Sequence, residues 1–491
     1  MKFSMVLWIN ALFLGLATLA VGADRPNIVL VFADDLGWMD TGYQGSSLME
    51  TPNLDRLASQ GMKFTAGYAA AGNCAPSRAC LLSGNYTPRH HVYAVGSTDR
   101  GPKSQMRLVP IPNKGGLAPE NVTMADALKS AGYATGHFGK WHLAGRDGAK
   151  PTEQGFDVSF DSFGEGEVKE GSEGNKAGPP EDPKGVYTLT RKACEFIEAH
   201  REGPFFCYLA HHAIHSPLQG KPESQARFRD KAAANPQASA MYAACTYDLD
   251  DSVGQLMAKL KELNLEENTL LVFTSDNGGV QGSSQEPLRG SKGGYYEGGI
   301  REPFLVRWPG VVKPGTTCDV PVINIDLFPT FLAAAGTPVP EGKVLDGESL
   351  LPLLKGEGNL SRQAIFWHFP GYLDSPVNRG RELDVRTGFR SRPVSVIHQG
   401  DWKLHLYLEE WALDGGRDGL PGNHAVELYH LAEDIGERHD LSAENLGKRD
   451  ELLNALLEWH ASVGALLLHE PNPQYDPNAK IGGKGKGQGK G

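Results

Sequence analysis

The sequence has little cysteine, and its basic residues are outnumbered by acidic ones. Only six of the 491 residues are Cys, too few for a disulfide framework to hold together a chain of this size. There are 59 acidic side chains against 48 basic ones, so the formal net charge is −11 and the isoelectric point is near 5.8. Proteins that bind nucleic acids usually present a basic surface, so this balance argues against a nucleic acid as partner.

Apolar runs long enough to span a membrane are also absent, except at the N-terminus. The segment Met5–Ala20 carries no charge, comes after the basic Lys2 and is followed by Val21–Ala23, which resembles a cleavage site. This pattern predicts a signal peptide over residues 1–23, with an uncleaved membrane anchor as the alternative. We therefore expect an exported protein, periplasmic or secreted, with no stable membrane span after signal cleavage.

The remaining composition is that of a globular protein. Hydrophobic residues make up 40% and charged residues 22% of the chain, which excludes a disordered or fibrous class. The length suggests more than one structural unit. We predict a large N-terminal domain over residues 24–361, a smaller C-terminal domain over 362–470 and a flexible Gly- and Lys-rich tail over 471–491.

Buried strands alternate with helices in the larger part. Three continuous apolar runs predict strands at Asn27–Ala33, Pro204–Ala210 and Thr269–Ser275. Capping and breaking residues predict helices at 52–60, 124–131, 238–263 and 326–335. This order predicts an α/β fold with a large, mostly parallel central sheet flanked by helices. After residue 362, short alternating runs at 394–398 and 402–407 and a helix at 449–463 predict a smaller α+β domain with antiparallel strands.

Polar residues follow each of the three predicted strands. They are Asp34 and Asp35, His211 and His212, and Asp276 and Asn277. Ligands of α/β sheets bind beyond the carboxyl ends of the strands, so these residues mark a candidate active site. Carboxylate and amide oxygens are hard donors, which favours Ca²⁺ or Mg²⁺ over zinc.

The pentapeptide Cys74–Arg78 has the form Cys-x-Pro-x-Arg, and it resembles the signature of the formylglycine-dependent type I sulfatases, members of the alkaline phosphatase superfamily. Other segments resemble motifs of the same family in the same order. They are the metal-site pairs 34–35 and 276–277, the second signature 132–142, the histidine motif 212–217 and the lysine loop 288–301. Segments 399–403 and 427–431 resemble further family landmarks, to which we assign no chemistry.

The resemblance implies a modified nucleophile and a metal. Cys74 would be oxidised to Cα-formylglycine by a modifying enzyme that reads Cys74, Pro76 and Arg78. The implied metal is Ca²⁺, with Mg²⁺ as the weaker alternative. Its implied ligands are Asp34, Asp35, position 74, Asp276 and Asn277.

The implied reaction proceeds through a sulfo-enzyme intermediate at position 74. Arg78 would steady the nucleophile and the metal site, while Lys140 and Lys292 would hold the sulfate oxygens. His215, with help from Lys292, would protonate the departing alcohol, and His142 would take the proton that allows sulfate to leave.

We therefore predict a hydrolase that removes sulfate from a sulfated carbohydrate or an aryl sulfate. The alternatives are a phosphate or phosphonate ester hydrolase of the same superfamily and, further off, an inactive polysaccharide-binding protein. Substrate choice would lie in the loops 145–184 and 371–392. Four side chains are candidate sugar contacts: His368, Arg390, Arg392 and His405.

Overall fold

A nine-stranded mixed sheet forms the centre of the structure, a computed structural model that describes residues 25–162, 178–233, 239–280, 282–373 and 388–479. The strand order is β4-β3-β5-β1-β6-β7-β2-β8, and β9 pairs with β2. The five strands from β4 to β6 run parallel, whereas β7 is antiparallel to both of its neighbours. The strands are β1 (Asn27–Ala33), β2 (Met62–Tyr68), β3 (Ala134–Gly139), β4 (Val158–Phe160), β5 (Phe205–Ala210), β6 (Thr269–Ser275), β7 (Arg301–Arg307), β8 (Thr316–Cys318) and β9 (Val322–Ile323).

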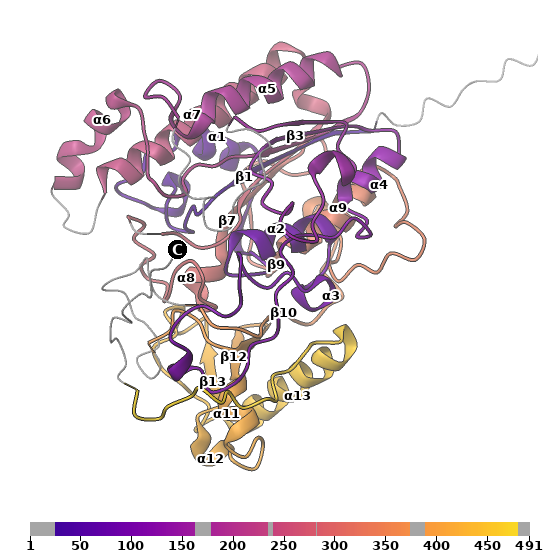
Figure 1. Cartoon of the computed structure of the whole chain (residues 1–491). Helices are drawn as coiled ribbons and strands as arrows, with labels where there is room; N and C mark the ends of the chain where they lie inside the picture. The colour runs from indigo at the N-terminus through magenta and orange to yellow at the C-terminus, as the bar shows by residue number, and fades with distance from the viewer. Residues whose placement is uncertain (1–24, 163–177, 234–238, 281, 374–387, 480–491) are drawn as a thin grey trace, which may run out of the picture.

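Helices cover both faces of this sheet (Figure 1). Ile28, Leu30 and Phe32 of β1 pack in one core with α2, α4 and α9, while Val29 and Val31 pack in another with α1, α5 and α7. This alternation follows from the two-residue repeat of a strand, and a strand buried on both faces is apolar throughout. The helices are α1 (Pro52–Gln60), α2 (Cys74–Ser83), α3 (Thr87–His90), α4 (Met124–Ser130), α5 (Val186–Ala199), α6 (Pro222–Ala233), α7 (Ala240–Glu262), α8 (Glu297–Ile300), α9 (Leu327–Ala334) and α10 (Leu351–Lys355).

A second, antiparallel sheet follows in the chain and lies below the first in Figure 1. Its order is β10-β11-β12-β13, and α13 packs against β11 and β12. Its apolar residues share one core with Tyr68 of β2 and with Tyr295 and Ile300 near α8. The elements are β10 (Ile365–Phe369), β11 (Val394–Gln399), β12 (Trp402–Tyr407), α11 (Leu408–Leu413), α12 (Leu420–Asn423), β13 (Val426–His430) and α13 (Leu446–Val463).

The predicted fold class is confirmed: a large, mostly parallel sheet with flanking helices, and a small antiparallel C-terminal sheet. The domain boundary at residue 362 stays a prediction. The predicted signal peptide and residues 480–491 of the predicted tail lie outside the described residues. In the described part, no helix is long and apolar enough to cross a membrane. All six Cys residues are described, and none forms a disulfide.

Candidate active site

Each of the five parallel strands delivers a polar residue to the same edge of the sheet. Ala33 at the end of β1 pairs with Ser275 at the end of β6, and Phe32 pairs with Ala210 at the end of β5. Parallel strands in this register end together, so the residues that follow them meet. These residues are Asp161 after β4, Lys140 after β3, His211 and His212 after β5, Asp34 and Asp35 after β1, and Asp276 and Asn277 after β6.

The residues after β1 and β6 are directly bonded to one another. The backbone N–H of Asp35 donates to Oδ1 of Asp276 at 3.1 Å, and Nδ2 of Asn277 donates to Oδ1 of Asp35 at 2.8 Å. Asp35 has a φ of 69°, a left-handed conformation that Asp tolerates better than most residues. The side chains of Asp34, Asp35, Asp276 and Asn277 are fully buried.

Helix α2 brings Cys74 and Arg78 to this group. Cys74 is the first residue of the helix, and its Sγ lies with one carboxylate oxygen each of Asp34 and Asp276 inside a cluster whose atoms are all within 4.8 Å of one another. Arg78 lies one turn further on, with Nε and Nη2 at 3.0 and 2.8 Å from Oδ2 of Asp276. Its Nη1 donates to the backbone oxygen of Lys140 at 2.9 Å. Burial raises the pKa of the Cys74 thiol despite the nearby lysines, so the unmodified side chain is a protonated thiol at neutral pH.

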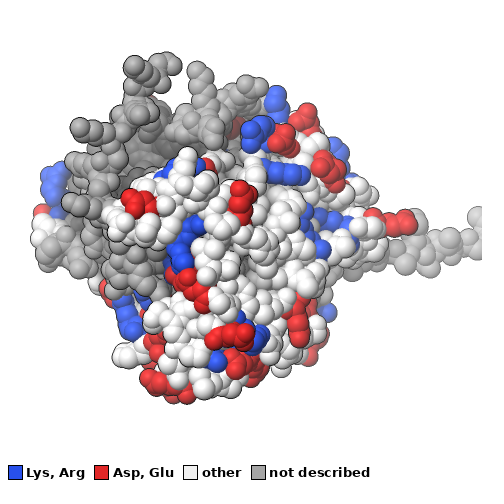
Figure 2. All heavy atoms as spheres, turned by 60° about the horizontal axis from the view of Figure 1, so that its bottom comes forward, with Lys and Arg blue, Asp and Glu red and all other residues white. Residues whose placement is uncertain are grey.

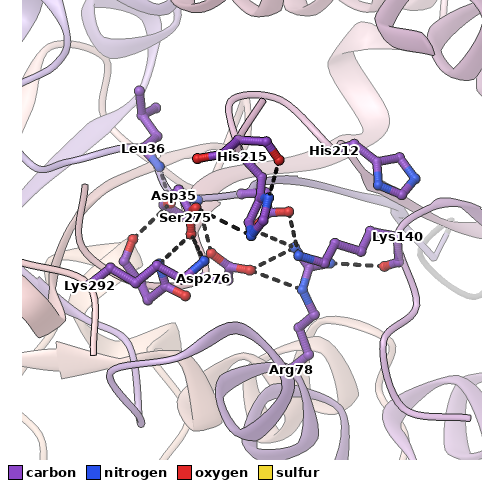
Figure 3. A network of polar contacts seen from close by, with 12 residues as sticks. Asp35, Leu36, Arg78, Lys140, His212, His215, Ser275, Asp276 and Lys292 are labelled. Carbon is purple, nitrogen blue, oxygen red and sulfur yellow. Dashed lines mark hydrogen bonds and ion pairs between the residues drawn. The ribbon is translucent and has the colours of Figure 1, made fainter. Parts of the chain in front are cut away.

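Two lysines complete the charged network (Figure 3). Nζ of Lys140 lies 2.6 Å from Oδ2 of Asp34, and Nζ of Lys292 lies 2.5 Å from Oδ1 of Asp35. Oδ1 of Asp34, Oδ2 of Asp35 and Oδ1 of Asn277 are buried and accept no hydrogen bond from the residues that the structure describes. Buried oxygens without donors are costly unless a cation binds them, so these three atoms fit a hard metal ion.

The carboxylate pKa values support the same interpretation. Burial and the negative charge of Asp34 raise the pKa of Asp276 to about 7, although Arg78 opposes the shift. Burial would also raise the pKa of Asp34, but the charges of Lys140 and Arg78 outweigh it and lower that pKa well below its usual value. A divalent cation between the two carboxylates would keep both ionised.

Two histidines approach the cluster in neutral form. Burial, together with Lys140 and Arg78, holds the pKa of His142 well below 6.5. Nε2 of His215 lies 3.8 Å from Oδ2 of Asp35, and its Nδ1–H donates to the backbone oxygen of Ser216 at 2.7 Å. Burial and Lys292 lower the pKa of His215 to about 4. Neutral imidazoles are proton acceptors, and a bound anion would raise both pKa values.

The two histidines that follow β5 have structural partners. His211 is buried, and its Nε2 lies 3.2 Å from Oγ of Ser252, in a position consistent with a core histidine. Nε2 of His212 lies 2.8 Å from Oδ1 of Asp161. Asp161 was not among the sequence candidates, because the three residues of β4 are too short a run to predict as a strand.

Three of the four candidate sugar contacts are wrong. His368 and His405 are each 1% exposed and are bonded inside the fold, His368 to Ser395 and His405 to Glu437. Arg392 is 1% exposed and forms ion pairs with Glu409 and Glu410. The sequence predicts that these polar residues contact sugar, but their side chains are buried within the fold.

Arg390 alone of the four lies beside the site. Its Nη1 donates to the backbone oxygen of Lys292 at 3.4 Å. The central parts of both predicted specificity loops, 163–177 and 374–387, lie outside the described residues.

The charge of the site differs from that of the whole chain. Three carboxylates, Asp34, Asp35 and Asp276, face three cations, Arg78, Lys140 and Lys292. A divalent metal would therefore make the site positive by about two charges, which suits an anionic substrate. On the face shown in Figure 2, acidic and basic side chains are interspersed.

Comparison with known proteins agrees with the geometry. The profile of the sulfatase family matches residues 26–337, and a profile described as N-sulphoglucosamine sulphohydrolase, C-terminal, matches residues 291–388. Arylsulfatase A of Homo sapiens is 34% identical, in a match that covers 91% of this chain and 89% of that protein. N-acetylgalactosamine-6-sulfatase of Mus musculus is 32% identical over 90% of this chain and 86% of that protein.

Solved structures give the same result. The crystal structure of Ps i-CgsB, also determined in complex with k-i-k-neocarrahexaose, has a TM-score of 0.69 and 29% identity, covering 89% of this chain and 93% of that one. A phosphonate monoester hydrolase of Agrobacterium radiobacter shares the fold at a TM-score of 0.63 and 21% identity, covering 89% and 96% of the two chains. With the family profile covering most of the chain and relatives above 30% identity over nearly its whole length, the chain belongs to the sulfatase family.

Proposed function

We propose that this sulfatase is an exported enzyme that removes sulfate from a sulfated carbohydrate, with Ca²⁺ and a formylglycine derived from Cys74 at its active site. The observation that carries the proposal is the position of Cys74. It is the first residue of a buried helix, in one cluster with Asp34 and Asp276, and two lysines lie on the adjacent carboxylates. A thiol with a raised pKa is a poor nucleophile there, which supports a modified side chain as the reacting group.

The proposed metal ligands are the oxygens of Asp34, Asp35, Asp276 and Asn277, together with position 74. All are hard oxygen donors once Cys74 is converted, and the buried oxygens without hydrogen bonds lie among them. Bound Ca²⁺ would orient and acidify a hydroxyl of hydrated formylglycine, which supplies the attacking oxygen.

The remaining roles belong to residues of the chain itself. Lys140 and Lys292 would bind the sulfate oxygens, and Arg78 would hold Asp276 and the nucleophile in place. His142, neutral in the free site, would accept a proton. His215 is the more exposed histidine and would donate a proton to the leaving alcohol after the substrate's charge has raised its pKa.

A sugar as the alcohol part of the substrate is supported by the relatives. N-acetylgalactosamine-6-sulfatase acts, by its name, on a sulfated amino sugar, and Ps i-CgsB was crystallised with a neocarrahexaose. The apolar N-terminal segment supports export to the periplasm or the medium. Export predicts that the mature chain starts near Asp24, which N-terminal sequencing of secreted protein would test.

The test is sulfate release by protein produced together with a formylglycine-generating enzyme. We expect release from 4-nitrophenyl sulfate and from at least one member of a panel of sulfated carrageenan and glycosaminoglycan oligosaccharides. The Cys74→Ala variant is the matched control for contaminating activity. Faster hydrolysis of 4-nitrophenyl phosphate or a phosphonate ester would favour the superfamily alternative. Oligosaccharide binding without turnover by protein whose residue 74 is converted would favour the inactive binding protein.

A further inference from the structure

The segments 399–403 and 427–431, to which the sequence assigns no chemistry, contribute the fully buried Lys403 and the half-buried Glu427 to the second sheet. Lys403 of β12 has no exposed side-chain surface. Its Nζ lies 2.8 Å from Oε1 of Glu297 and 3.0 Å from Oε1 of Glu437. A buried lysine is rare and costly, because its charge loses contact with water. The positive charge of Lys403 therefore neutralises buried negative charge that another part of the fold requires.

Glu297 is the residue that this lysine neutralises. It is the first residue of α8 and lies five residues after Lys292 in the chain. Its Oε2 accepts hydrogen bonds from Arg301 and Tyr68, both at 2.9 Å, and its backbone N–H donates to Oε2 of Glu437 at 2.6 Å. Burial would raise the pKa of Glu297, but Lys403 and Arg301 outweigh it and lower the pKa to about 2.

Glu427 of β13 forms a second attachment. Its Oε2 accepts hydrogen bonds from the hydroxyls of Tyr296, Tyr407 and Tyr429 at 2.7, 3.0 and 3.0 Å. Tyr429 in turn lies 3.2 Å from Nη1 of Arg289, whose guanidinium sits 3.8 Å above the ring of Tyr296. Arg289 and Tyr296 are thus both held by the second sheet.

The loop between these attachments carries Lys292 and has no regular structure. Gly290 and Gly293 have φ values of 81° and 88°, and residues 288–296 form no helix or strand. Glycine leaves such a segment with little conformational preference of its own. Lys292 nevertheless reaches Oδ1 of Asp35, while its backbone N–H donates to Gly279 at 3.2 Å. The middle of the loop is also held by the Gly293 N–H, which donates to Gly72 at 2.6 Å, so the contacts at the ends of the loop add to those at its middle.

We propose that Lys403 and Glu427 are positioning residues for Lys292. Together with Glu437 they form an anchor cluster that binds Tyr296 and Glu297. These contacts determine where the ammonium group of Lys292 contacts the sulfate. The second sheet then helps to position a side chain of the active site. This inference rests on the proposed role of Lys292 in binding sulfate.

The experiment compares loop variants with matched controls. Lys403→Met and Tyr296→Phe break the two attachments. Arg307→Met is the control for the first, because Arg307 is a buried cation at the opposite end of the central sheet, bonded to Glu266. Tyr133→Phe is the control for the second, since it removes one buried hydroxyl bonded to Pro26.

We expect Lys403→Met to lower kcat/KM for 4-nitrophenyl sulfate by about tenfold or more and Tyr296→Phe by about threefold, with the controls near wild type. In a Lys292→Ala background the same two substitutions should lower kcat/KM by less than about twofold, because the lysine that the replaced side chains position is already absent. Equal losses in both backgrounds would overturn the inference.

Hydrogen exchange of residues 288–300 gives a readout independent of activity. We expect the amides of this segment to exchange about tenfold faster in Lys403→Met and Tyr296→Phe than in either control. Unchanged exchange would overturn the inference even if activity falls. If the wild type releases no sulfate, the proposed function fails, while the exchange data still decide whether the cluster holds the loop. If Lys403→Met does not fold, Tyr296→Phe and Glu427→Gln carry the test.

Discussion

Cys74 is the residue on which the proposed chemistry depends. Its side chain is 2% exposed, and Ala or Ser at the first position of α2 would meet no steric obstacle. We expect Cys74→Ala to lower kcat by about 1,000-fold or more, because no nucleophile remains, and to leave the melting temperature within a few degrees of wild type. Sulfate release and circular dichroism measure the two effects. Activity near wild type would remove Cys74 from the mechanism.

Asn277 allows the metal to be tested without changing a charge. Its Oδ1 is buried and accepts no hydrogen bond, whereas Nδ2 bonds Asp35. A ligand that binds only the folded state stabilises it by about 2.7 kcal/mol at 100 times its dissociation constant. We expect Ca²⁺ to raise the melting temperature of the EDTA-treated wild type, and Asn277→Ala to lose most of that increase.

The matched control for this experiment is Asn85→Ala. Asn85 is also a buried amide, but it bonds Val344 and Asp346 away from the cluster. This variant should keep the full response to Ca²⁺. If the melting temperature of the wild type is the same with EDTA and with Ca²⁺, the proposed metal site is contradicted. If Mg²⁺ raises the melting temperature more than Ca²⁺ does, the bound metal is Mg²⁺ instead.

At the scale of an element, helix α2 buries the whole pentapeptide Cys74–Arg78. An enzyme that reads Cys74, Pro76 and Arg78 cannot reach them while the helix is packed between the sheet, α4 and α9. Conversion should therefore occur on the unfolded chain. We expect a formylglycine-generating enzyme to modify a synthetic peptide of residues 68–84 but not the purified, folded Cys74 protein.

Mass spectrometry of the tryptic peptide that contains position 74 measures the conversion. Denatured protein that is presented during refolding should be converted, and this serves as the positive control. Complete conversion of the folded protein, at a rate equal to that of the peptide, would show that α2 opens readily and would contradict the argument from burial.

The elements that the sequence predicts are those with a continuous pattern. Strands β1 and β6 have the predicted bounds because each contains six consecutive apolar or β-branched residues, 28–33 and 269–274, and polar residues adjoin both runs. Strands β2 and β3 carry no such pattern, since Lys63, Gly67 and Gly136 interrupt them. Their partners in the sheet, far away in sequence, decide their structure.

The candidate site was predictable to the extent that strand ends and motif residues mark it. The carboxylates, Arg78 and both lysines lie together as the sequence and the family resemblance suggest. The anchor cluster was not predictable. Lys403 and Glu297 are 106 residues apart, and nothing local shows that either is buried. From the sequence, such charged residues are expected on the surface. They are buried only because the two sheets pack together in the folded chain.

At the scale of the whole molecule, many buried histidines make folding sensitive to acid. Burial, with a contribution from neighbouring charges, lowers the pKa of His90 and of His368 from 6.5 to about 3. Both lie away from the candidate metal site. His90 contacts Cys80, and His368 bonds Ser395 and faces the ring of His460, whose pKa is also lowered, to about 4.

The sign of the pH effect follows from these shifts. Above pH 6.5 neither state binds protons at these histidines, so they add no pH dependence. As the pH falls below 6.5, the unfolded chain takes up a proton on each, and the folded chain does not do so until about pH 3. Each histidine thus lowers the free energy of unfolding by about 1.4 kcal/mol per pH unit. From pH 6.5 to 5 the two together lower it by about 3 kcal/mol, because at pH 6.5 the unfolded histidines are already half protonated.

We expect urea unfolding of the wild type to show a steep loss of stability between pH 6.5 and 5. The double variant His90→Gln, His368→Gln should be less stable at pH 7.5, because it disturbs two packed sites. Its loss with falling pH should be shallower by about 2.7 kcal/mol per pH unit, since the two proton-binding groups are gone from the unfolded state. Tyr133→Phe is the control: it removes a buried hydroxyl bonded to Pro26 and no histidine, so it should leave the slope unchanged. Parallel pH profiles for the wild type and the double variant would show that both histidines bind protons equally in the two states, so that burial does not keep them neutral.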